Sequence, residues 1–179
     1  MRDRWIDEHA LQHVLRDLIC LAVVGDHVRW VVTDDDDLVD WLSGAGRRWR
    51  EWAETLATRL AEDGVPPDGR VRSLARDIGA NWVPDGWLTS EAARRLIAQR
   101  LGRVAQETRY QHSQSEGSDA ELLGSVATGL EAQVSAARDA RRATTTAGSV
   151  RDELHSGSTR RGHASRACRG CSGDDGPPS

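Results

Sequence analysis

The chain has 179 residues, enough for one domain of ordinary size and a tail. Phe is absent and Tyr occurs once, which disfavours an all-β fold because strands are enriched in aromatic and β-branched residues. Three cysteines do not make a disulfide framework, no apolar run reaches the roughly 18 residues of a membrane span, and the acidic N-terminus does not resemble a signal peptide. We therefore expect a soluble, cytoplasmic protein that makes no membrane contact.

The net charge of −4 is distributed unevenly. No Lys occurs, so all 24 basic residues are Arg. From Arg138 to the end there are 8 Arg and 5 acidic residues, whereas the preceding part has 16 Arg and 23 acidic residues. The sequence thus predicts an acidic body with a basic tail.

The first half of the chain has the apolar period of two amphipathic helices. Apolar residues recur at steps of three and four from Ile6 to about Val32. The four aspartates at 34–37 end this helix and supply carboxylates for the N-cap of the next one. The second helix has a narrow apolar stripe over 38–60, and Gly64 takes the position after its C-terminus.

The second half repeats this pattern after a link of 25 residues, 65–89, which contains a predicted short helix at 71–78. A third long helix is predicted from Ser90 to about residue 112. A fourth follows a capping box at 118–121 and fades near Arg142.

Each long helix of about 25 residues spans roughly 37 Å. Only the link between the second and third helices can run the length of such a bundle. Short, long and short connections predict an all-α, ferritin-like four-helix bundle with a lengthwise crossover. We assign residues 1–142 to the bundle and predict that 143–179, rich in Arg, Ser, Thr and Gly, are a disordered tail.

Polar residues on the first two helices have two interpretations each. His9 and His13 have the spacing of metal ligands and share a helix face with Cys20 and His27, but a face in solvent or at a subunit contact explains the same row. On the second helix, acidic residues gather away from the apolar stripe, as a solvated face would, at Asp40, Glu51 and Glu54. No Glu-x-x-His occurs on the four helices, so no di-iron site inside one bundle is predicted.

The tryptophans also leave two interpretations open. Trp41, Trp49 and Trp52 lie on the apolar stripe of the second helix and are expected to fill the core in place of Phe. The other interpretation makes them oxidisable residues that intercept radicals beside a redox site. Trp82 and Trp87 are expected to hold the crossover against the bundle.

The tail carries two candidate binding features. Cys168 and Cys171, with His155 and His163 before them, could bind zinc. Arginines neutralise phosphates without reading sequence, so non-specific DNA binding is predicted for Arg138, Arg141, Arg142, Arg151, Arg160, Arg161, Arg166 and Arg169. The alternative is a tail that only confers solubility.

Residues 18 to about 133 resemble the Dps family, the mini-ferritins that protect DNA during starvation. The order of elements matches, including the short helix in the crossover, and the stretch 60–70 looks like the family's Leu-Gly-Gly-x-Pro-x-Gly passage. The resemblance implies a dodecameric shell, built from dimers, that oxidises Fe²⁺ with peroxide between subunits and stores ferric iron. It also implies that the protein is associated with the nucleoid.

The resemblance also implies which residues would bind iron. Of the family's five ligand positions, His27 keeps the first, and Glu54 replaces an Asp at the fourth. The other three fall on Val39, Ser43 and Thr58, which are not iron ligands, although Asp40 beside Val39 could substitute. The sequence therefore leaves three functions open: an iron-oxidising mini-ferritin that binds DNA through its tail, a ferritin-like structural or DNA-binding protein without ferroxidase activity, or a bundle whose metal site has been replaced by the surface for an unrelated partner. Our prediction is a Dps-like protein that protects DNA and handles iron.

Overall fold

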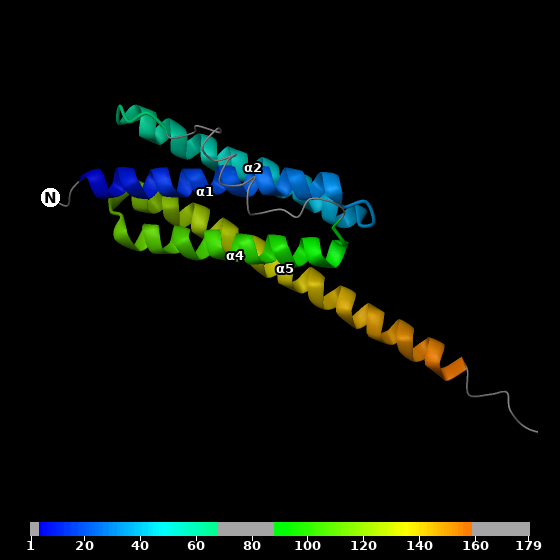
Figure 1. Ribbon diagram of the computed structural model, residues 1–179. Helices are drawn as coiled ribbons and strands as arrows, with labels where there is room; N and C mark the ends of the chain where they lie inside the picture. The colour runs from blue at the N-terminus through cyan, green and yellow to red at the C-terminus, as the bar shows by residue number, and fades with distance from the viewer. Residues whose placement is uncertain (1–3, 68–87, 159–179) are drawn as a thin grey trace, which may run out of the picture. The chain divides into compact units, whose positions relative to one another are not determined.

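The computed structural model describes residues 4–67 and 88–158, with side-chain surroundings for 7–67 and 88–138. Four helices fill these ranges, and the described residues contain no strand (Figure 1). They are α1 (Arg4–Val31), α2 (Asp36–Glu62), α4 (Ser90–Gln114) and α5 (Gly117–Ser158). The predicted all-α class is confirmed. The predicted short helix at 71–78, with Trp82 and Trp87, lies outside the described residues.

The helix ends follow the predicted local chemistry at α2. Asp35 is the N-cap, and its side chain accepts a hydrogen bond from the Leu38 N–H at 2.9 Å. Asp36 and Asp37 lie in the first turn, where carboxylates are stabilised by the helix dipole. At the other end, Gly64 has φ +75°, the left-handed conformation that glycine adopts at low cost after a helix.

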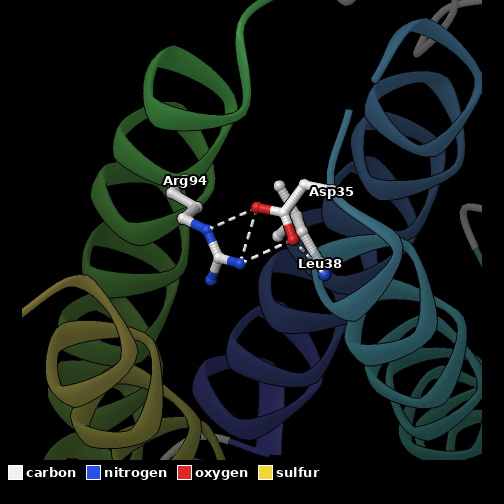
Figure 2. A network of polar contacts seen from close by, with 3 residues as sticks. All are labelled: Asp35, Leu38 and Arg94. Atoms are coloured by element: carbon white, nitrogen blue, oxygen red, sulfur yellow. Dashed lines mark hydrogen bonds and ion pairs between the residues drawn. The ribbon is translucent and has the colours of Figure 1, made fainter. Parts of the chain in front are cut away.

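Contacts between distant residues show how the helices run. Gly25 of α1 lies against Trp49 of α2, and these two helices form one antiparallel hairpin. Asp35, at the start of α2, binds Arg94, near the start of α4, so these two helices begin at the same end of the bundle (Figure 2). The end of α2 and the start of α4 therefore lie at opposite ends of the bundle, the arrangement for which a lengthwise connection was predicted.

Two charged contacts join the hairpins at opposite ends of α2. At its start, the Arg94 guanidinium donates to both carboxylate oxygens of Asp35, at 2.6–2.9 Å. Near its end, Arg59 Nε donates to Asp119 of α5 at 2.7 Å. Asp119 is buried in the first turn of α5, which begins at Gly117, so Ser118 lies inside the helix and the predicted capping box is wrong.

The core is built from the apolar stripes of the four helices. Trp49 is fully buried, and its indole N–H donates to Gln133 Oε1 of α5 at 2.7 Å. Trp41 and Trp52 are partly buried and pack against the same core. The prediction that tryptophan replaces Phe in the core is confirmed for Trp49, whereas Trp41 and Trp52 lie at the edge of the core.

The fourth long helix extends further than predicted. α5 continues to Ser158 instead of fading near Arg142, because residues 143–158 contain no proline and a formed helix propagates at little cost per residue. By contacts, the chain divides into the units Met1–Arg141 and Arg142–Ser179. The rest of the predicted disordered tail, residues 159–179, lies outside the described residues. None of the described helices is both long and apolar enough to cross a bilayer.

Candidate functional site

The three predicted iron ligands lie on the outer faces of α1 and α2. His27, Asp40 and Glu54 are all exposed. Asp40 and Glu54 are fourteen residues apart on one helix, which places them about 21 Å apart along its axis. One ion cannot bind both within a single subunit. Among the described residues, no three His, Cys, Asp or Glu side chains lie close enough together to hold a metal ion.

A guanidinium lies beside the second and third family ligand positions. Arg29 Nη1 of α1 donates to Ser43 Oγ at 3.1 Å, and Ser43 Oγ donates to the Val39 carbonyl at 2.9 Å. The positions that the resemblance assigns to a His and an Asp are thus occupied by a valine and by a serine bound to a cation. The Arg29 guanidinium has no lone pair to give to Fe²⁺, and its positive charge would repel the ion.

The remaining two ligand positions, Glu54 and Thr58, lie one turn apart on α2. The Thr58 hydroxyl donates to the Glu54 carbonyl oxygen at 2.9 Å, so it is engaged with its own helix. The Glu54 carboxylate is exposed. On α1, Asp26 is the residue next to His27, and its carboxylate forms an ion pair with Arg50 of α2. Within one subunit, neither His27 nor Glu54 belongs to a described group of three ligands that could hold an ion.

Two apolar residues on the same face of α1 as His27 are exposed. Val23 is 40% and Trp30 77% exposed, and with His27 they follow one another at helical steps of four and three. We name Val23, His27 and Trp30 the α1 stripe. A large apolar side chain as exposed as Trp30 is uncommon on a protein surface that contacts only water, so this stripe is a candidate contact surface.

The other polar residues of α1 do not all face solvent. His9 is exposed, but His13 and Cys20 are half-buried and line a pocket of about 210 Å³ between α1 and α4. Opposite them, α4 contributes Arg100 and Glu107. Sequence reasoning found the row on α1 but missed its partners, because a helical period does not tell which neighbouring helix a polar face meets.

The predicted DNA-binding arginines are only partly within the described residues. Arg138 of α5 is exposed. The backbone of α5 includes Arg141, Arg142 and Arg151. The remaining candidates lie outside the described residues, as do both cysteines of the possible zinc site: Arg160, Arg161, Arg166, Arg169, Cys168 and Cys171.

Comparison with known proteins identifies the fold. No family model and no curated protein matches the chain. Among solved structures, Dps92 from Deinococcus radiodurans matches with a TM-score of 0.71 and 20% identity, over 78% of this chain and 87% of that one. Dps from Staphylococcus aureus matches with a TM-score of 0.69 and 10% identity, over 78% and 97%.

A third structure is Dps from Microbacterium arborescens in the high iron form, with a TM-score of 0.63 and 18% identity over 77% of this chain and 93% of that one. At such identities the likeness is one of fold. It covers nearly the full length of each of these proteins. The chain therefore has the ferritin-like four-helix fold of the Dps proteins.

Proposed function

We propose that this chain is a Dps-like protein that handles iron in an oligomeric shell and protects DNA in the cytoplasm. The observation that carries the proposal is the Dps-type fold, matched over 78% of this chain. The charge distribution supports both parts: the acidic body suits the gathering of Fe²⁺, and the arginine-rich C-terminal region suits phosphate binding.

Assembly is supported by the α1 stripe. A second copy that packs on Trp30 would bury this indole and bring residues of another subunit to His27, which lacks enough ligands in its own subunit. Native mass measurement should find an oligomer, with twelve subunits expected from the resemblance. Trp30→Asp should reduce the mass, whereas Tyr110→Asp, which changes an aromatic residue of α4 that is 58% exposed, should not. A monomeric wild-type protein would refute the shell.

The iron part of the proposal is tested by mixing the purified protein with Fe²⁺ and peroxide. We expect ferric absorbance to rise faster than in a protein-free control, and iron to remain with the protein through gel filtration. His27→Ala should slow the reaction and Thr55→Ala should not, because Thr55 is an exposed neighbour of Glu54 at no predicted ligand position. A wild-type rate equal to the control, with no retained iron, would refute this part.

A second function is favoured by one specific contact. Arg29 donates a hydrogen bond to Ser43, so a cation lies where the resemblance expects an iron ligand. The chain could therefore keep the shell and the DNA-binding region but lack ferroxidase activity. The triple variant Val39→His, Ser43→Asp and Thr58→Glu restores the ligand types that the resemblance implies. If the second function is correct, this variant should oxidise Fe²⁺ and the wild type should not. Oxidation by the wild type faster than in the protein-free control would contradict it.

The DNA part is tested by gel retardation of plasmid. Retardation should weaken steeply with salt, because neutralising each phosphate releases counterions. A chain ending after Arg138 should not retard plasmid, and one ending after Ser158, which keeps half of the eight C-terminal arginines, should bind more weakly than the full chain. Full binding by the shorter of these chains would refute the assignment to these arginines.

A further inference from the structure

The pocket between α1 and α4 lies apart from the predicted iron-ligand and DNA-binding residues. Its volume is about 210 Å³, below the roughly 300–1,000 Å³ of pockets that hold drug-sized molecules. Its floor is apolar, because Leu21, Val24 and Val104 line it and are buried. Arg103 also lines it and is exposed, so the pocket opens to solvent. The pocket therefore suits a small molecule with an apolar part.

Polar residues of the two helices face one another across this pocket in antiparallel order. Three electrostatic interactions define the order, and along α1 they join His13 with Glu107, Asp17 with Arg103, and Cys20 with Arg100. Glu107 and Arg100 are seven residues apart, about 10 Å along α4. The pocket thus has a carboxylate end at Glu107 and a guanidinium end at Arg100.

Positive charge prevails at the guanidinium end. Burial lowers the pKa of Arg100, and the like charge of Arg103 lowers it further. Two guanidinium groups that repel each other beside an apolar wall are both stabilised by an anion between them. The charged groups here include three arginines, counting Arg16, which acts on Asp17, against the carboxylates of Asp17 and Glu107. This local excess of positive charge contrasts with the acidic body around it.

The same charges disfavour a metal ion as the occupant. The arginines at one end repel a cation, and no three His, Cys, Asp or Glu side chains of the described residues lie close enough together to hold one. The charge of the pocket therefore favours an anion, and its floor favours an anion that carries an apolar chain.

We propose that this pocket binds a small monocarboxylic acid. The carboxylate of the ligand lies between Arg100 and Arg103, whose planar guanidinium groups present pairs of N–H donors that match its two oxygens. The carbon chain of the ligand covers the apolar floor. Glu107 at the other end repels a second carboxylate, so the pocket selects an acid with one charged group.

Isothermal titration calorimetry of the full chain with hexanoate, at about pH 7 where this acid is ionised, tests the pocket. We expect saturable binding of one hexanoate per chain. Hexylamine and hexanol have the same carbon chain without the negative charge, and should bind about tenfold more weakly or less. Inorganic phosphate has the charge without the chain and should also bind more weakly. Absence of saturable hexanoate binding, or tighter binding of hexylamine or phosphate, would overturn the proposal.

Variants of α4 locate the bound acid. Arg103→Gln changes an exposed side chain, so the chain should still fold, and hexanoate binding should weaken about tenfold or more. Arg95→Gln is the matched control, because Arg95 pairs with Glu91 on the exposed face of the same helix and should not affect binding. Glu107→Gln should strengthen binding, because it removes a negative charge from the pocket wall. Equal losses of affinity in Arg103→Gln and Arg95→Gln would indicate general surface attraction and refute the site.

Cys20 reports directly on occupancy, because this residue lines the pocket. Saturating hexanoate should slow the labelling of Cys20 by iodoacetamide in the wild type, and at the same concentration should slow it less in Arg103→Gln. Peptide mass spectrometry distinguishes Cys20 from Cys168 and Cys171, whose labelling rates serve as the internal control. An unchanged rate at Cys20 under saturating hexanoate would mean that the acid binds elsewhere, which contradicts the proposal.

Discussion

The contact between Asp35 and Arg94 offers the sharpest test of how the two hairpins are held together. Asp35 has two roles: it caps α2 through the Leu38 N–H, and it accepts bidentate hydrogen bonds from Arg94 of α4 (Figure 2). Asp35→Ala removes both roles, whereas Asp35→Asn keeps an N-cap of equal quality and removes only the charge. The two variants together separate capping from the link between the hairpins.

The expected magnitudes follow from burial. The side chains of Arg94 and Asp35 are 17% and 15% exposed, so this ion pair is intermediate between a surface pair and a buried pair. A surface pair contributes about 0–1 kcal/mol, and breaking a buried pair on one side costs about 3–5 kcal/mol. We expect Asp35→Asn to lower the free energy of unfolding by about 2–3 kcal/mol. Asp35→Ala should cost about 1 kcal/mol more, through loss of the cap.

The assay is urea unfolding followed by circular dichroism at one fixed protein concentration, because subunit association also changes apparent stability. The double variant Asp35→Asn with Arg94→Met should show a coupling energy of about 1–2 kcal/mol. Arg95→Met is the matched control, since Arg95 pairs with Glu91 on the exposed face of the same helix and should cost less than about 0.5 kcal/mol. A coupling energy near zero, or equal losses in Arg94→Met and Arg95→Met, would refute the reasoning.

Two further predictions concern a close contact and a partly buried carboxylate. A Cβ at Gly129 would collide with the Trp52 ring, so Gly129→Ala should lower the free energy of unfolding by about 1–3 kcal/mol. At Gly102 a Cβ meets open space, so Gly102→Ala should raise the free energy of unfolding by up to about 1 kcal/mol. Chemical denaturation measures both changes, and two changes of the same sign would contradict this prediction. Burial raises the pKa of Asp17 above its ordinary value of 3.8, so the stability it contributes is present below that pH and is lost as pH rises through the higher folded value. Asp17→Asn should therefore raise the melting temperature at neutral pH, with an advantage that shrinks in acid, and a lower melting temperature at neutral pH would contradict the cause given for the shift.

The helices themselves could be predicted because their causes are local. The aspartates before α2 and Gly64 after it define its ends through capping and a left-handed residue, and both depend only on neighbouring residues. The end of α5 was the exception. Residues 143–158 lack the apolar stripe that marks a packed helix, but they contain no proline that would end a helix. A segment without an apolar stripe can therefore still be helical.

The candidate site could be predicted only in part. The sequence located His27, Asp40 and Glu54, and helical spacing already separated Asp40 from Glu54 along α2. It did not show that Arg29 reaches Ser43, because that contact joins two helices whose relative rotation depends on how their side chains pack. The same limit hid the position of His13 between two carboxylates.

The sequence by itself determined the number of long helices, their apolar faces and the need for a lengthwise link, since periodicity, capping and the lengths of connections depend on residues close together in the chain. The tertiary structure alone decided which polar faces meet. Asp35 finds Arg94, Arg59 finds Asp119, and His13 finds Glu107 across distances of about sixty to ninety residues in the chain. Such pairs form because close packing of the core brings the helices together in one register, and no local signal in either partner indicates the other.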